Sequence, residues 1–287
     1  MTDSFCTKWP SGKSAAASFC FDLDAESVVL SFVPQAASRM SVMSHQSYGP
    51  LTGVPRLLHL LEQHGIKATF FVPGYTAHRY PDTVRAIVSE GHEIAHHGYL
   101  HEPLGEADEA SEIGYLERGI AALQEVAGVT PVGYRAPSWE LNYRSAALLH
   151  QRGFLYDSSL MDADNPYELA TGHGTDSIVE IPIHWALDDW EQYCYVPDLF
   201  GSGLIESPAK AREMWSLEFQ ATTAEGGCFV LTAHPFLTGR PSRAAALAQI
   251  MEEAVAAPQV WVATMREIAE HARAQALAPR LLTPPTI

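Results

Sequence analysis

The stretch Ala16–Asp24, which reads AASFCFDLD, is a short apolar run that ends in two carboxylates. Its length and its aromatic residues predict a buried β-strand rather than a helix. Later apolar runs also end in polar side chains or lie just before them: His97 and His101, Arg135, Asp157, and His234. We therefore expect polar side chains from distant parts of the chain to gather at the carboxyl ends of neighbouring strands.

Helical patterns separate these runs. Strands are expected at 16–24, 68–72, 92–96, 132–136, 154–157, 178–185, 228–234 and 260–264. Helices are expected at 54–64, 81–90, 107–126, 142–152, 207–225, 242–256 and 265–274. This alternation predicts an α/β fold in which a parallel sheet closes into a barrel. The active site of such a barrel lies at the carboxyl ends of its strands.

The expected organisation is one barrel domain at 15–278, with an N-terminal extension at 1–14 and a loose, Pro-rich tail at 279–287. The stretches Leu30–Leu51 and Asp188–Ser207 fit neither pattern, so they are expected to be long functional loops.

Composition limits the function classes. The chain has 287 residues, of which 47% are hydrophobic and 18% charged, so it can bury a sizeable core. A formal charge of −16 argues against nucleic acid and anionic membranes as partners. No apolar run is long enough to span a bilayer, and no secretory signal is visible, so a cytoplasmic location is expected. The four cysteines show no pairing pattern.

The first candidate site residues are carboxylates and histidines. Asp22 and Asp24 share one strand face about 7 Å apart, which leaves room for a metal-bound water between a base and a ligand. His97 and His101 would lie on one face of a helical turn, a geometry that suits a metal. Each pair alone has a plainer explanation, a turn or surface histidines. Together they predict a divalent metal on Asp24, His97 and His101, with Asp22 as base.

Two further elements complete this site. Arg135, at the end of a predicted strand, could orient Asp22 and keep its pKa low. His234, after the apolar run 228–231, could protonate a leaving group. Asp157 is one candidate to orient His234, and Asp188 and Asp189 are rivals that the sequence does not separate.

As an ordered set, these motifs resemble those of the polysaccharide deacetylase superfamily, also called the NodB-homology or carbohydrate esterase 4 superfamily, over residues 15–265. The Asp base and Asp ligand match Asp22 and Asp24, although here Leu23 separates them. The H-x-x-x-H pair matches His97 and His101. The R-x-P-aromatic motif matches Arg135, Pro137 and Trp139, and the late general-acid histidine matches His234.

Other segments resemble a cytoplasmic branch of this superfamily, with cyclic imide hydrolases, allantoinase-like enzymes and peptidoglycan-deacetylase-like proteins. These segments are 53–58, 67–74, 184–190 and 234–240. The resemblance implies a distorted (β/α) barrel and a homotetramer.

The leading hypothesis is a zinc-dependent hydrolase that opens small cyclic imides or related ring amides; Co²⁺, Mn²⁺ or Ni²⁺ would also suit the site. Trp139, Trp190 and Tyr48 are the candidate substrate-binding residues. The first alternative is an N-acetyl-sugar or peptidoglycan deacetylase, and the second is an allantoinase-like ureide hydrolase. An iron site for oxygen chemistry would leave Asp22 and Arg135 without a role.

Overall fold

The computed structural model describes residues 8–201 and 204–286. The strands are β1 Ala15–Asp22, β2 Thr69–Val72, β3 Glu93–His96, β4 Gly133–Tyr134, β5 Tyr156–Asp157, β6 Tyr167–Ala170, β7 Ser177–Glu180, β8 Cys228–Ala233 and β9 Val260–Val262. They form one sheet in the order β6-β7-β5-β4-β3-β2-β1-β8, with β9 beside the start of β1. Only the β6–β7 pair among these described strands is antiparallel.

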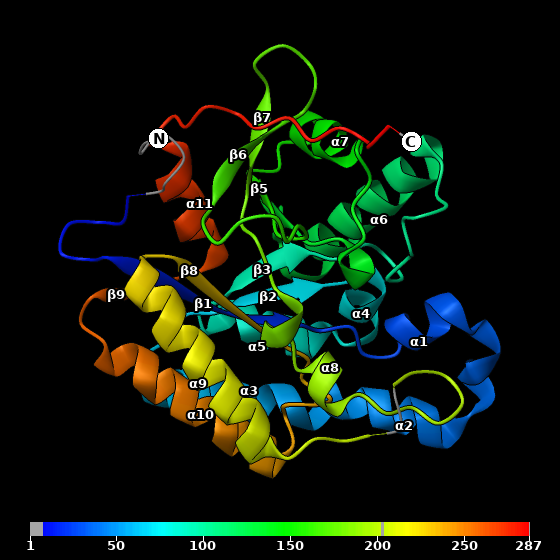
Figure 1. Ribbon diagram of the computed structural model, residues 1–287. Helices are drawn as coiled ribbons and strands as arrows, with labels where there is room; N and C mark the ends of the chain where they lie inside the picture. Colours follow the sequence, from blue (N-terminus) through cyan, green and yellow to red (C-terminus); the bar gives the residue numbers. More distant parts are fainter. Residues whose placement is uncertain (1–7, 202–203, 287) are drawn as a thin grey trace.

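The sheet curls on itself, with helices around it (Figure 1). In the described chain its outermost strands, β6 and β8, do not pair with each other, so the barrel is open. The predicted α/β class and distorted barrel are therefore confirmed.

The helices are α1 Ser27–Phe32, α2 Met40–Tyr48, α3 Val54–His64, α4 Gly74–Arg79, α5 Pro81–Ser89, α6 Glu109–Ala127, α7 Ser145–Gln151, α8 Trp190–Tyr193, α9 Pro208–Glu225, α10 Pro241–Ala256 and α11 Met265–Arg273. Local sequence sets several of their ends. The carboxylate of Asp108 accepts from the Ser111 amide at the start of α6, and Gly128 ends that helix with φ at 67°. A capping box of Thr264 and Glu267 begins α11.

Strand β1 lies in the middle of the core, and all eight of its residues are buried. One face, with Phe19 and Phe21, packs in the same apolar cluster as side chains of α3, α9 and α10. The opposite face, with Cys20, packs in a second cluster with side chains of α11. Figure 1 shows α3, α9 and α10 together on one side of the sheet and α11 on the other. A strand covered on both faces is expected to be mostly apolar, as β1 is apart from Ser18 and Asp22.

Several sequence-based expectations were wrong. The segment Leu30–Leu51 is mostly helical rather than a loop: it holds the end of α1, a 3₁₀ turn at Pro34–Ser38, α2 and the start of a π-helical turn at Gly49–Gly53. The strand expected at 178–185 ends at Glu180, and β6 was not predicted. The tail is not wholly loose, because the Arg280 amide donates to the Glu168 carbonyl and Arg280 pairs beside β6.

Other expectations concern the chain as a whole. Within the described residues, no helix is both long and apolar enough to cross a membrane. Cys20, Cys194 and Cys228 are buried free thiols, and Cys6 lies outside the described residues. Residues 1–7 of the expected N-terminal extension also lie outside them.

Candidate active site

The two aspartates stand where β1 ends. Asp22 is the last residue of the strand, and both side chains are about 1% exposed. The Asp24 carbonyl accepts hydrogen bonds from the hydroxyls of Ser27 and Thr76, each at 2.7 Å. These bonds fix the backbone of Asp24, so its carboxylate is held in place and faces the histidines that follow β3.

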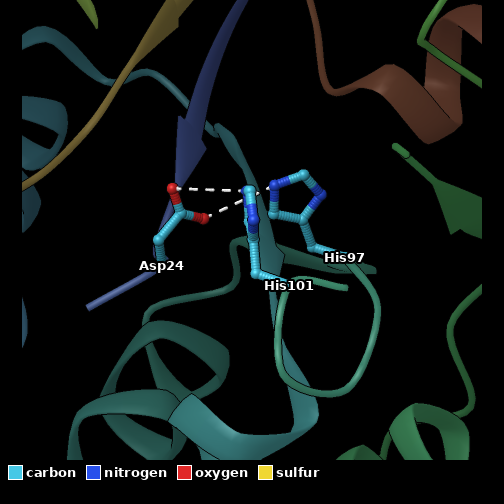
Figure 2. Close-up of side chains that lie close together, drawn as sticks. All are labelled: Asp24, His97 and His101. Carbon is cyan, nitrogen blue, oxygen red and sulfur yellow. Dashed lines mark ion pairs between the residues drawn. The ribbon is translucent and has the colours of Figure 1, made fainter. Parts of the chain in front are cut away.

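His97 and His101 approach Asp24 from the loop after β3 (Figure 2). Nε2 of His97 lies 3.4 Å from Oδ1 of Asp24, and Nε2 of His101 lies 3.8 Å from Oδ2. The helical turn expected here was wrong. The chain makes an irregular loop in which Gly98 has φ at 73° and His101 has φ at 59°. A left-handed conformation is uncommon for histidine, and such strain tends to occur at functional sites.

The donor atoms of these three residues suit a divalent metal. They all lie within 4.8 Å of one another. Both carboxylate oxygens of Asp24 and Nε2 of His97 are buried without a hydrogen-bond partner in the described structure, and Nε2 is the ring nitrogen of His101 that faces Asp24. Nδ1 of His97 donates to the Arg135 carbonyl at 2.8 Å, so Nε2 is unprotonated and its lone pair is directed at Asp24. Buried polar atoms without partners are costly, so this set fits a bound cation.

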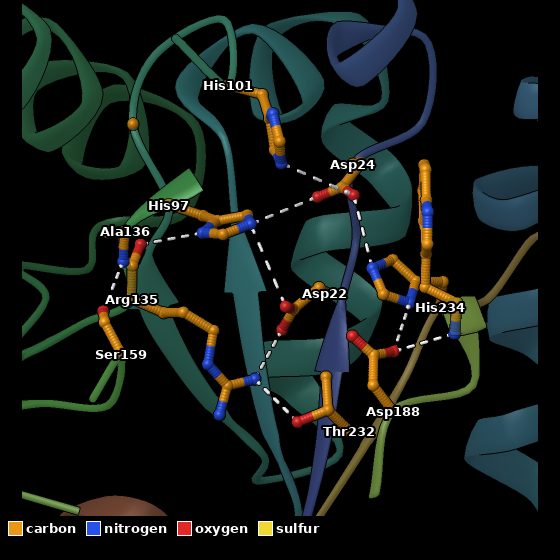
Figure 3. Close-up of polar contacts among 12 residues, drawn as sticks. Asp22, Asp24, His97, His101, Arg135, Ala136, Ser159, Asp188, Thr232 and His234 are labelled. Carbon is orange, nitrogen blue, oxygen red and sulfur yellow. Dashed lines mark hydrogen bonds and ion pairs between the residues drawn. The ribbon is translucent and has the colours of Figure 1, made fainter. Parts of the chain in front are cut away.

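Arg135 joins Asp22 to the rest of the sheet (Figure 3). Its Nη1 donates to Oδ1 of Asp22 at 2.8 Å and to Thr232 at 3.1 Å. Its Nε and Nη2 donate to the carbonyl and hydroxyl of Ser158, each at 3.0 Å, and its guanidinium lies 4.0 Å from the ring centre of Phe71. The guanidinium is therefore held rigidly beside one carboxylate.

The two carboxyl groups differ in pKa. Burial would raise the pKa of Asp22, but Arg135, with His97 and His234, lowers it below its usual value. Burial raises the pKa of Asp24 to about 6 in the protein without a metal. The lowered pKa keeps Asp22 ionised, so its carboxylate can accept a proton.

His234 is oriented by Asp189, one of the two rivals of Asp157. Nδ1 of His234 donates to Oδ1 of Asp189 at 2.7 Å, and the His234 amide donates to the same oxygen at 2.9 Å. The amide and hydroxyl of Thr238 donate to Oδ2. Burial would lower the pKa of His234, but Asp188 and Asp189 raise it well above its usual value. The protonated Nε2 side faces the pocket, 3.6 Å from Asp24.

Asp157 does not orient His234, so that prediction was wrong. Its carboxylate accepts from the Ser159 hydroxyl at 2.8 Å and packs beside the buried Glu180. Glu180 accepts from the amides of Ser159 and Leu160. These two acids therefore support the turn at Ser158, which holds Arg135. Asp157 has this role instead of orienting His234, and the difference depends on how distant segments of the chain pack.

A cavity of about 210 Å³ opens above these groups. Its walls are mainly aromatic and apolar: Val28, Phe32, Trp139, Trp185, Trp190 and Phe200. The rings of Trp139 and Trp185 stack at 4.4 Å. Trp139 and Trp190 therefore line the cavity as expected, whereas Trp185, Phe32 and Phe200 were not foreseen.

Tyr48 is not among the lining residues of this cavity. Its hydroxyl lies 2.7 Å from Nη1 of Arg56 and donates to the Gly239 carbonyl at 3.2 Å, and Arg240 stacks over its ring. These contacts give Tyr48 a packing role behind the site rather than the substrate contact expected from sequence.

Fold and site together define an open α/β barrel with a candidate metal cluster at the carboxyl ends of its strands, beside an aspartate and a histidine that can transfer protons. A protein from Mycobacterium smegmatis described as a polysaccharide deacetylase has a crystal structure that matches with a TM-score of 0.97 and 59% identity, over 100% of this chain and 99% of that chain. A peptidoglycan deacetylase from Helicobacter pylori is 31% identical over 245 residues, which are 76% of this chain and 83% of the relative.

The family model for polysaccharide deacetylases matches residues 39–156. An allantoinase structure matches with a TM-score of 0.78 and 28% identity, over 93% of this chain and 92% of that chain. The chain belongs to the polysaccharide deacetylase family.

Proposed function

We propose that this protein is a metal-dependent hydrolase that opens small cyclic imides or related ring amides. The observation that carries the proposal is the small, aromatic-walled cavity directly above the Asp24, His97 and His101 cluster. Pockets for drug-sized ligands usually measure roughly 300–1,000 Å³, so about 210 Å³ suits a smaller molecule. Flat indole rings favour a flat ring as substrate.

Asp24, His97 and His101 would hold the metal, with Zn²⁺ the first candidate. When bound, such an ion polarises a carbonyl and lowers the pKa of water, which makes attack feasible near neutral pH. The hydrogen bond from His97 to the Arg135 carbonyl keeps that histidine in the tautomer that binding requires.

Asp22 would take the proton of the attacking water. Its carboxylate lies 3.9 Å from Nε2 of His97, beside the metal ligands, and the Arg135 guanidinium keeps it ionised and aimed. A base with a lowered pKa is weaker but is fully available at neutral pH.

His234 would protonate the nitrogen that leaves. Asp189 fixes its ring through Nδ1 and stabilises the imidazolium, so Nε2 carries the proton that is delivered. An imide nitrogen leaves more readily than a simple amide nitrogen, so this step should matter less for an imide substrate.

The second candidate function is deacetylation of an N-acetylated sugar. The similarity to a peptidoglycan deacetylase favours it, and the same residues would serve in the same roles. The similarity to an allantoinase favours ring opening instead, with a ureide as a further possible ring substrate. The small cavity is the reason for ranking ring opening first.

The experiment is turnover of succinimide, glutarimide, hydantoin, allantoin and N-acetylglucosamine oligomers by zinc-loaded protein. Each reaction is repeated after chelation and again after zinc is restored. Ring opening that is lost on chelation and recovered on reloading supports the proposal. Acetate release from the sugars, with no ring opened, would refute it and favour the second candidate.

A further inference from the structure

Glu191 lies at the rim of the cavity, on the short helix α8. It follows Asp188, Asp189 and Trp190 directly, so the segment that orients His234 also places this carboxylate beside the substrate space. Its carboxylate is exposed to solvent, although partial burial and the nearby Asp188 raise its pKa above the usual value. Any substituent that projects from a bound ring toward the rim would meet this charge.

The other acids that line the cavity have partners. Asp22 pairs with Arg135 at 2.8 Å, and Asp24 belongs to the proposed metal cluster. Asp188 accepts from the Trp190 amide at 2.8 Å and lies 3.4 Å from Nδ1 of His234. Glu191 has no hydrogen bond or ion pair within the described residues, and no described lysine or arginine lines the cavity. It is the one lining acid without a direct hydrogen bond or ion pair in the described structure, although the charge of His234 acts on it across the cavity.

The rim around Glu191 is aromatic as well as acidic. Trp185 is 44% exposed, and Trp190 and Phe200 also line the cavity. Indole faces attract cations, and a carboxylate beside them adds to that attraction. A carboxylate on a substrate would meet repulsion from Glu191, and the lining cation, the His234 imidazolium, is already paired with Asp189.

We propose that Glu191 selects substrates by charge, favouring ring amides with an ammonium substituent and rejecting those with a carboxylate. The inference rests on the proposed ring-opening function and narrows its substrate class.

The test uses three succinimides that carry a 2-aminoethyl, a propyl or a 2-carboxyethyl group on a ring carbon. The wild-type zinc-loaded protein should have the highest kcat/KM for the amine and the lowest for the acid. Glu191→Gln should lower the amine-to-acid ratio by about tenfold, since attraction and repulsion at an exposed site are each worth about threefold. The propyl compound should change by less than about twofold, and added salt should lower the ratio in the wild type.

Glu213→Gln is the matched control, because Glu213 is an exposed acid on α9 that does not line the cavity. It should keep the wild-type ratio. A ratio that stays the same in Glu191→Gln would overturn the inference while ring opening still supports the proposed function.

If no ring is opened, measurements of binding still test charge selection by Glu191 apart from the proposed ring-opening function. Quenching of tryptophan fluorescence by the same three compounds measures affinity without turnover. Tighter binding of the amine that is lost in Glu191→Gln supports charge selection even though the proposed function has failed. Equal affinities for the three compounds would overturn the inference.

Discussion

Replacing Arg135 by lysine tests how the proposed base is held. The guanidinium is fully buried and donates to four acceptors, on Asp22, on Thr232 and twice on Ser158. A lysine ammonium keeps the positive charge but cannot reach acceptors on both sides of the fork. The carbonyl and hydroxyl of Ser158 lose their donor, at a cost of about 1–3 kcal/mol each.

Arg135→Lys should therefore lower the free energy of unfolding by about 2–6 kcal/mol. Misplacement of Asp22 by an ångström should lower kcat by about 10²-fold. Metal content should stay at the wild-type level, because His97 donates to the backbone carbonyl of residue 135, which the substitution leaves in place. Denaturant unfolding, steady-state kinetics and metal analysis of the reloaded protein measure the three effects.

Arg212→Lys on α9 is the control, since Arg212 makes no hydrogen bond or ion pair within the described residues. It should leave stability and kcat unchanged. A wild-type kcat in Arg135→Lys would refute the role of Arg135 in holding the base, and loss of metal would show that its role is to support the ligands instead.

Three more predictions concern other parts of the site and the fold. Asp189→Asn should lower kcat for a simple amide more than for an imide, because His234 loses its carboxylate partner; equal losses on both substrates would contradict a leaving-group role. Gly119→Ala should lower the free energy of unfolding by about 1–3 kcal/mol, because the new Cβ would lie 2.1 Å from Nε2 of His96. Gly114→Ala in the same helix is the control: its new Cβ would meet nothing within 4 Å, so it should raise the free energy of unfolding slightly. Burial holds the pKa of His92 at about 4 rather than 6.5, so between about pH 6.5 and pH 4 the unfolded chain binds a proton that the folded chain does not. The free energy of unfolding should therefore decline as the pH falls through this range, and His92→Gln should flatten the decline measured by denaturant unfolding.

The strand ends could be predicted from the sequence, and with them most of the site. Asp22, His97 and Arg135 each follow an apolar run, and parallel pairing brings such ends together. This reasoning needs only the local pattern and the geometry of a parallel sheet.

The partner of His234 could not be predicted, because it depends on how distant segments pack. Asp157 and Asp189 both lie near strand ends in sequence, and only the folded chain places Asp189 beneath the imidazole. The loop at His97–His101 was misread for a related reason. Spacing alone suggested a helical turn, whereas the left-handed backbone at His101 is imposed by tertiary structure.

The segment Leu30–Leu51 was misread because its helices are short. Pro34 and Pro50 interrupt the pattern, and α2 has only two buried residues, Val42 and Gln46. A helix with so little apolar face gives no clear periodic signal. Strand β6 could not be predicted because its four residues, Tyr167–Ala170, include a charged one and form the edge of the sheet.

The central claim is that Asp24 belongs to the metal site while Asp22 handles the proton. Metal content and succinimide turnover of zinc-reloaded Asp22→Asn test it together, beside Asp24→Asn prepared in the same way. Asp22→Asn should keep one metal ion per chain and lose turnover by about 10²–10⁴-fold, whereas Asp24→Asn should lose the metal. Loss of metal from Asp22→Asn, or wild-type turnover by it, would contradict the account.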